Sequence, residues 1–307
     1  MSEEGGAPPR MLLVGGGGGL VGRSILEEFG EDWRIRSLHR RPATSEAGRP
    51  NLEWIPGDAA TVSDWSPLLR DVDLVLNLAW YRFGPDRRFA PLARGLERLI
   101  RASETTGISR FVHVSVPDAP TSLETGLPYL VRKREVDRAL EASSLRYAIV
   151  RPTMLFAARD KLLTVMLRTM ARYHRFPIFG DGEYHLSPIA ARDLARIVRR
   201  EAAAGARRNV VAGGPTRWRY RDLTDALFAA LGRPPKYFGL SPRGSVRLAR
   251  LLETFGSTLL YAYEVEWLLS DMLGPPPYDG LDRPLADVRP FLESEAARYR
   301  RASPARG

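Results

Sequence analysis

The first half of the chain alternates short apolar runs with longer stretches in which apolar residues recur at helical spacing. The apolar runs predict six strands: Met11–Gly15, Trp33–Leu38, Leu52–Ile55, Val72–Ala79, Phe111–Ser115 and Tyr147–Val150. Helices are expected at Leu20–Phe29, from Phe89 to Ile100, and at Tyr129–Glu141. The fourth run is continuously apolar, which is typical of a strand buried on both faces of a sheet.

Strands separated by helices of this length indicate βαβ units. We therefore predict an α/β fold, with a Rossmann-type doubly wound parallel sheet and a smaller C-terminal α/β substrate lobe. The expected domains are a disordered N-terminus over 1–9, a dinucleotide-binding Rossmann domain over 10–155 with 186–205 returning to it, a substrate lobe over 156–185 and 206–298, and a flexible tail over 299–307. Right-handed crossovers place ligands at the carboxyl ends of such strands.

The alternation loosens beyond Pro152, where Gly- and Pro-rich segments interrupt helical stretches. Helices are expected there at Leu162–Arg172, Leu223–Leu231 and Val246–Leu260, and Ala190–Arg200 is expected to return to the first domain. Several aromatic residues of this region are candidate walls for a substrate: Phe156, Phe176, Phe179 and Tyr184. The same residues suit an ordinary hydrophobic core, and we favour the core.

The composition of the chain excludes several classes of protein and of functional site. With 307 residues, 44% of them hydrophobic and 27% charged, the chain has enough apolar material for a sizeable core, which excludes a largely disordered protein. The absence of cysteine excludes disulfides, cysteine nucleophiles, zinc–thiolate sites and iron–sulfur clusters. The four histidines show no pair four residues apart, so no metal site is expected.

The formal net charge is +10, and 43 of the 46 basic residues are arginine. Because these residues are spread along the chain without interleaved aromatics, we expect a solvated surface, no nucleic-acid partner, and a small-molecule substrate. The N-terminus lacks the pattern of a secretory signal, and no apolar stretch predicts a transmembrane segment. A cytoplasmic monomer or homodimer is expected.

A glycine-rich loop joins the first predicted strand to the first predicted helix. It satisfies G-x-x-G-x-x-G at Gly16, Gly19 and Gly22, although its five consecutive glycines also fit other spacings. Such a loop brings backbone N–H groups at a helix N-terminus close to a pyrophosphate. The alternative is a flexible connector, but the strand before it and the amphipathic helix after it favour dinucleotide binding, with Leu20 and Val21 among the contacts.

The second predicted strand ends in His39-Arg40-Arg41 and offers no carboxylate for a ribose 2′-hydroxyl. Two guanidinium groups suit a 2′-phosphate, through bidentate charge-assisted hydrogen bonds. Arg40 and Arg41 therefore favour NADP(H) over NAD(H). The alternative is that both are ordinary surface arginines.

Tyr129 and Lys133 stand four residues apart, so both side chains lie on one face of the predicted helix. The chain has only three lysines, which makes a Tyr-x-x-x-Lys pair informative. A phenol needs a nearby cation to act as acid or base near neutral pH, and Lys133 provides one. Ser115 ends the fifth strand and is expected to face the same crevice. The alternative is a tyrosine ring packed on a lysine stem.

Together, the glycine loop, the strand-ending serine, Tyr-x-x-x-Lys and the segment LRYAIVRP resemble the short-chain dehydrogenase/reductase superfamily, and within it the extended or atypical, NAD-dependent epimerase/dehydratase-like members. The resemblance implies that Tyr129 is the proton donor or acceptor, that Lys133 holds the nicotinamide ribose and lowers the tyrosine pKa, and that Ser115 orients the substrate oxygen. It further implies cofactor contacts at Asp58, Ala79, Trp80 and Pro152.

The sequence departs from sugar-modifying relatives in two places. Ala157-Ala158 stand where those relatives commonly show Gly-Pro, and Asn77 stands where many carry histidine. The leading hypothesis is therefore an NADP(H)-dependent oxidoreductase acting on a carbonyl or alcohol between Ser115, Tyr129 and the second lobe. The alternatives are an NAD-dependent sugar epimerase or dehydratase, and a non-catalytic NAD(P)-binding assembly or sensor protein.

Overall fold

A computed structural model of the chain describes residues 8–16, 18–40, 49–82, 84–157, 161–256 and 261–300. The chain divides into two compact units. The first, here called the sheet unit, contains the described residues up to Val116, together with Thr125–Arg151 and Leu194–Val210. The second unit contains Pro117–Glu124, Pro152–Asp193 and the described residues from Val211 onward.

The sheet unit is built on a seven-stranded sheet in the order β11-β6-β5-β4-β1-β2-β3. Its strands are β1 (Arg10–Val14), β2 (Arg34–His39), β3 (Leu52–Pro56), β4 (Leu74–Asn77), β5 (Arg110–Val114), β6 (Tyr147–Pro152) and β11 (Arg208–Ala212). Neighbouring strands from β3 to β6 in this order all pair in parallel. The order reverses between β1 and β4, which is the switch point of a doubly wound sheet, and the predicted fold class is confirmed.

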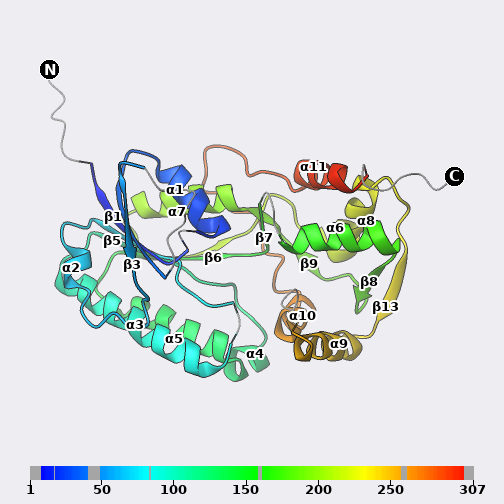
Figure 1. The fold of residues 1–307 in the computed structure, drawn as a ribbon, viewed down its shortest axis with the longest axis horizontal. Coiled ribbons are helices and arrows are strands. Elements are labelled where there is room, and N and C mark those ends of the chain that lie inside the picture. The colour runs from blue at the N-terminus through cyan, green and yellow to red at the C-terminus, as the bar shows by residue number, and fades with distance from the viewer. Residues whose placement is uncertain are drawn as a thin grey trace, which may run out of the picture. The chain divides into compact units, whose positions relative to one another are not determined.

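Helices cover both faces of this sheet (Figure 1). One face carries α1 (Leu20–Phe29) and α7 (Ala191–Ala203), and the other carries α3 (Asp86–Thr105) and α5 (Pro128–Ala142), with the short α2 (Ser66–Leu69) near the edge. Met11, Leu12, Leu13 and Val14 of β1 are each 0% exposed because helices pack on both sides of the central strand.

The register of the parallel strands determines which residues meet at the carboxyl edge of the sheet. Val14 of β1 pairs with Asn77 of β4, and Asn77 pairs in turn with His113 of β5. The segments that follow these strands therefore begin side by side. They are the glycine loop, the stretch from Leu78 to Trp80, and the residues after Val114.

The second unit combines helices with three two-stranded sheets, β10-β7, β12-β9 and β13-β8. Its strands are β7 (Leu155–Phe156), β8 (Phe176–Phe179), β9 (His185–Leu186), β10 (Ile189–Ala190), β12 (Trp218–Arg219) and β13 (Tyr237–Leu240). Its helices are α4 (Thr121–Gly126), α6 (Lys161–Tyr173), α8 (Tyr220–Ala230), α9 (Pro242–Thr254), α10 (Ala262–Leu268) and α11 (Arg289–Arg300).

Two predictions for this region have clear outcomes. The four aromatic residues considered as substrate walls lie in one buried core cluster, at 4 to 8% exposure, so the core alternative is confirmed: Phe156, Phe176, Phe179 and Tyr184. The helix predicted over Val246–Leu260 is wrong at both ends. It begins at Pro242, after Ser241 accepts the Gly244 N–H, and ends at Thr254, shortly before Gly256 adopts a left-handed φ of 80°. Residues 257–260 lie outside the described part.

Two further searches cover the described residues alone. None of their helices combines the length and the apolar character that crossing a membrane requires. Within the same ranges, no cluster of three or more histidine, aspartate or glutamate side chains is arranged to hold a metal ion.

Candidate functional site

The glycine loop leaves β1 in a conformation that only glycine adopts easily. Gly15 and Gly16 have φ values of 73° and 75°, in the left-handed region. A Cβ atom on Gly15 would lie 2.6 Å from the Cα atom of Ala79, so the loop can approach the segment after β4 only because a side chain is missing. Gly17 lies outside the described residues.

The loop ends at Gly19, which is the N-cap of α1. Gly19 donates its N–H to the Gly16 carbonyl at 2.8 Å, and the cap makes no side-chain hydrogen bond. The first turn of α1 also carries no acidic residue, so no side chain of that turn neutralises the positive end of the helix. Gly16, Gly19 and Leu20 are exposed, Val21 is half-buried and Gly22 is buried. This backbone cradle fits a pyrophosphate.

A second cluster, which joins the predicted Arg40 and Asp58 to two residues that were not predicted, lies where β2, β3 and β4 end. The guanidinium of the exposed Arg40 lies 4.9 Å from the centre of the Tyr81 ring, and that of Arg88 lies 4.5 Å from it. Asp58 accepts the Ala60 N–H at 3.0 Å and the Tyr81 hydroxyl at 3.3 Å. Two cations therefore flank one phenol ring beside a carboxylate. Arg41 lies outside the described residues.

Tyr129 lies in the first turn of α5 and is half-buried among aromatic rings. Its ring meets those of Phe89 and Trp80 edge to face, with centroids 5.8 and 6.3 Å apart. Phe89 belongs to α3, and Trp80 follows Ala79 in the segment after β4. The candidate phenol of α5 is thus positioned by packing against two other parts of the sheet unit.

Lys133 lies one turn further along α5 and is 2% exposed. Its Nζ atom donates a hydrogen bond to the Val114 carbonyl at 2.9 Å and lies 4.6 Å from the centre of the Trp80 ring. Burial lowers the pKa of Lys133 from 10.5 to about 7, although the Asp137 charge opposes the shift. Burial thus brings the pKa of the predicted cation close to neutral pH.

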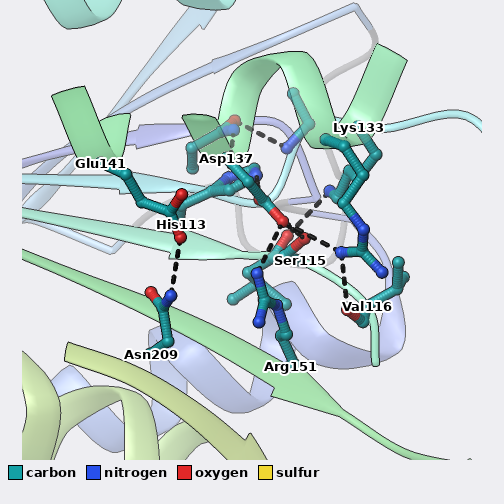
Figure 2. A network of polar contacts seen from close by, with 12 residues as sticks. His113, Ser115, Val116, Lys133, Asp137, Glu141, Arg151 and Asn209 are labelled. Atoms are coloured by element: carbon teal, nitrogen blue, oxygen red, sulfur yellow. Dashed lines mark hydrogen bonds and ion pairs between the residues drawn. The ribbon is translucent and has the colours of Figure 1, made fainter. Parts of the chain in front are cut away.

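Ser115 follows β5 directly, and its N–H donates to the Val150 carbonyl at 2.8 Å. The side chain is buried, and its hydroxyl donates a hydrogen bond to Asp137 Oδ2 at 2.9 Å (Figure 2). The same oxygen accepts hydrogen bonds from Arg134 at 3.0 Å and Arg151 at 3.2 Å. Ser115 thus belongs to a buried polar network centred on Asp137.

His113 continues this network on the other side of Asp137. Its Nε2 atom lies 3.4 Å from Asp137 Oδ1, which is longer than an ordinary hydrogen bond, so we treat the contact as electrostatic attraction. Its Nδ1 atom lies 2.8 Å from the Asn77 side-chain nitrogen. Burial, with a smaller contribution from the Lys133 charge, lowers the pKa of His113 from 6.5 to about 4.

Asp137 remains ionised despite its position. Burial alone would raise the pKa of its carboxyl group. The nearby His113 imidazole, with the charges of Lys133 and Arg151, outweighs burial and holds the pKa of Asp137 well below its usual range. A buried charge of this kind requires the groups that donate hydrogen bonds to it, here Ser115, Arg134 and Arg151, because removing one of them leaves the carboxylate poorly compensated.

Four of these network residues were not chosen from the sequence: His113, Arg134, Asp137 and Arg151. Two of them carry a signal that could have been used. Asp137 extends the Tyr129–Lys133 spacing by another four residues, which places it on the same face of α5. His113 precedes Ser115 by two residues in an extended segment, so both side chains point to the same side.

The remaining predicted residues follow strands or end them. Asp58 follows β3, Ala79 follows β4, and Pro152 is the buried last residue of β6. Ala79 donates its N–H to the Asn77 side-chain oxygen at 3.0 Å. In the sheet unit, the structure brings Ala79 to Gly15, and Trp80 to Lys133 and Tyr129.

Comparisons with known proteins identify relatives of this chain. The profile of a family described as NAD(P)H-binding matches residues 16–172, which is more than half of the chain. An uncharacterized sugar epimerase from Bacillus subtilis (strain 168) is 30% identical over 149 residues, covering 44% of this chain and 67% of that protein.

Solved structures with the same fold cover nearly the whole chain. A nucleoside-diphosphate-sugar epimerase from Staphylococcus aureus has a TM-score of 0.72 at 15% identity, covering 93% of this chain and 99% of its own. The dTDP-glucose 4,6-dehydratase DesIV from Streptomyces venezuelae, solved with NAD bound, has a TM-score of 0.63 at 18% identity, covering 96% and 97%. The chain belongs to the NAD(P)H-binding family and has the fold of the epimerase/dehydratase-like branch of the short-chain dehydrogenase/reductase superfamily that its motifs resemble.

Proposed function

We propose that the protein is an NADP(H)-dependent oxidoreductase in which Tyr129 donates or accepts the proton. The observation that carries this proposal is the position of Tyr129 and Lys133, which meet Trp80 at the same sheet edge as the glycine loop. A nicotinamide cofactor supplies a hydride donor or acceptor when it is bound.

Side chains of the protein are proposed to transfer the proton to or from the substrate oxygen. Tyr129 takes the hydroxyl proton of an alcohol, or returns it to a carbonyl oxygen, as a general base or acid. Lys133, in its protonated form, stabilises the phenolate form of Tyr129 and binds the ribose. Ser115 orients the substrate oxygen. Because Lys133 is buried under Trp80, its charge acts in a medium with little water, where electrostatic effects are stronger.

The cofactor preference rests on the residues around Tyr81. The α1 N-terminus, with Gly16, Gly19, Leu20, Val21 and Gly22, is the proposed pyrophosphate site. Arg40 is the proposed ligand of a 2′-phosphate, with Arg41 as its predicted companion. Arg88 approaches the same phenol ring from α3 and supports a positive potential there. Asp58 lies in this cluster and is proposed near the adenine, while Ala79, Trp80 and Pro152 are proposed to flank the rest of the cofactor.

The experiment is turnover by the Tyr129→Phe variant on a panel of secondary alcohols and carbonyl compounds, followed by NADPH absorbance. Phenylalanine keeps the ring packing and removes the hydroxyl, so kcat should fall about 100-fold or more while NADPH affinity stays within about twofold. Tyr173→Phe, at an exposed position of α6, is the matched control. If the kcat of Tyr129→Phe matched that of the wild type, Tyr129 would not be the acid or base. A protein that binds nucleotide without catalysing a reaction would then be favoured.

A sugar epimerase or dehydratase is the second candidate, and the comparisons favour it. The Bacillus subtilis relative is named a sugar epimerase, and the similar structures include sugar epimerases and a dehydratase. The same Tyr129 chemistry would then oxidise and reduce one bound sugar with no net redox change. Tightly held cofactor in the purified protein, without net NADPH consumption on any carbonyl compound, would favour this candidate.

A further inference from the structure

Helix α9 of the second unit exposes a row of apolar side chains beside a row of arginines. We propose that these two rows dock the protein on the surface of an anionic lipid bilayer. Every residue that carries the proposal lies in the second unit, and the proposal does not depend on the function proposed above.

One side of α9 is buried and fixes the helix in the unit. Ser245 and Ala249 are buried on this side, and Ala249 shares a small core cluster with Ala262 and Val265 of α10. The two helices lie side by side (Figure 1). Because this packing fixes the rotation of α9 about its axis, it also determines which residues face outward.

The apolar row consists of Leu248, Leu251, Leu252 and Phe255, which recur at steps of three and four residues and so share one side of the helix. They are 36%, 54%, 44% and 82% exposed, in chain order. A single exposed leucine is ordinary on a protein surface, but four large apolar side chains within eight residues form a patch that marks an interaction site.

The basic row consists of Arg243, Arg247 and Arg250, which also lie one turn apart and are all exposed. None of the three forms an ion pair within the described ranges. Together they line a surface groove that α9 shares with Glu266 and Leu269 of α10. At about 3.6 residues per turn, the basic row runs next to the apolar row on the outward side of α9.

The carboxylates of this region are engaged by the protein. Glu253, the only acidic residue of α9, is half-buried and accepts the Ala262 N–H. Glu266 is also half-buried and accepts the Ser122 hydroxyl at 3.2 Å. The outward side of α9 therefore carries positive charge, which an anionic partner would complement.

The arrangement of the two rows favours a bilayer as that partner. Arginine stems can lie along apolar surface while the guanidinium groups reach phosphates, and leucine and phenylalanine side chains can enter the boundary of the acyl chains. With 13 residues, α9 is too short to cross a bilayer, so it would lie in the plane of the surface. Pairing of two copies through this side would gather both basic rows, whereas α9 offers no exposed carboxylate to compensate them.

The test is co-sedimentation of the full chain with vesicles over a range of lipid concentrations, in about 0.15 M salt. Vesicles of phosphatidylcholine with about 30% phosphatidylglycerol should bind the wild type at least about 25-fold more tightly than vesicles of phosphatidylcholine alone. Equal binding to both vesicles, or binding to neither, would overturn the proposal.

Arginine variants test the basic row. Arg243→Gln with Arg250→Gln should weaken binding to the anionic vesicles about 25-fold, since each basic residue near such a surface contributes about fivefold. Arg94→Gln with Arg101→Gln is the matched control, because these exposed arginines also stand seven residues apart on one helix, α3. It should bind within about twofold of the wild type, since distant charges are screened at this salt concentration. Equal losses in both variants would show attraction by net charge alone and would overturn the proposal.

Variants of the apolar row test insertion. Leu251→Ser with Phe255→Ser should weaken binding at least about tenfold, whereas Tyr173→Ser, at an exposed position of α6, should leave it within about twofold. Analytical ultracentrifugation without lipid tests the alternative occupant. If the wild type were a dimer that Leu251→Ser with Phe255→Ser dissociated, the face would be an interface between copies and the proposal would be wrong.

A fluorescent label shows which surface meets the lipid. The chain has no cysteine, so one introduced cysteine is labelled alone. Thr254→Cys and Thr105→Cys place a nitrobenzoxadiazole dye at the exposed last residues of α9 and α3. With anionic vesicles, the emission should shift to shorter wavelength for the dye at position 254 and stay unchanged for the dye at 105. Vesicle binding without a shift at 254 would place the contact elsewhere and contradict the proposal.

Discussion

At the scale of single residues, the main feature of the site is a lysine held where its charge is unfavourable. The Lys133 ammonium is buried against the Trp80 ring and donates a hydrogen bond to the Val114 carbonyl. Burial brings its pKa to about 7. A group tuned to change its charge near neutral pH is typical of functional sites, whereas a purely structural position would be filled better by an apolar side chain.

Because burying the Lys133 ammonium is unfavourable but is proposed to serve catalysis, we predict that Lys133→Met stabilises the protein and abolishes turnover. Methionine fills a similar volume without a buried amine, so the free energy of unfolding at pH 7 should rise by about 1 to 2 kcal/mol. Urea unfolding checks the value. Lys236→Met replaces an exposed lysine and should change stability by less than about 0.5 kcal/mol.

The difference in stability between the wild type and Lys133→Met should also depend on pH. Below pH 7 Lys133 is protonated in both states, and the full penalty of burying the ammonium is present. Between about 7 and 10.5 the unfolded chain binds more protons than the folded one, so the stability of the wild type rises with pH. The advantage of Lys133→Met should therefore shrink over that window. An advantage that stayed constant would show that Lys133 has an ordinary pKa.

Arg40 carries the second residue-scale prediction, which concerns the choice of cofactor. Arg40→Ser should weaken NADP⁺ binding about tenfold and leave NAD⁺ binding unchanged, because only NADP⁺ has the 2′-phosphate that the guanidinium is proposed to bind. Fluorescence titration of both nucleotides measures this. Arg34→Ser, at the other end of the same strand, is the matched control. If the wild type bound NAD⁺ at least as tightly as NADP⁺, the assignment of Arg40 would be wrong.

At the scale of secondary-structure elements, the sequence predicts burial better than it predicts pairing. The helix Leu20–Phe29 was predicted with the bounds of α1, because glycines and a strand enclose it. The apolar run Val72–Ala79 extends beyond β4 on both sides, since the ladder to β1 covers only Leu74–Asn77. Hydrophobicity continues where the chain packs without pairing, so it overestimates the strand.

Prediction of the candidate site from the sequence is limited in the same way. The Tyr129–Lys133 spacing is local to one helix and is visible in the sequence. The cover that Trp80 places over Lys133, and the meeting of Ser115, Asp137 and Arg151, join segments far apart in the chain. Such contacts depend on strand order and register, which one sequence does not display. The sequence therefore indicated a phenol with a cation, but not that the cation is buried or that Ser115 donates to a carboxylate.

At the scale of the whole molecule, the doubly wound sheet gathers one loop from each of several strands at a single edge. The glycine loop, the segment Ala79–Trp80 and Ser115 arrive there because Val14, Asn77 and His113 are aligned in the ladders. Helix α5 adds Tyr129 and Lys133 from the adjoining crossover. The family match indicates NAD(P)H binding, and we propose that the dinucleotide binds at this edge.

The central claim is that the reactive ring of the dinucleotide and the Tyr129 hydroxyl share this edge. The most direct measurement is a crystal structure of the protein grown with NADP⁺. We predict the pyrophosphate on the backbone of Gly16–Gly19, and the nicotinamide beside the hydroxyl of Tyr129. A nucleotide bound elsewhere, or a Tyr129 hydroxyl turned away from the ring and closed off from any substrate, would contradict the account.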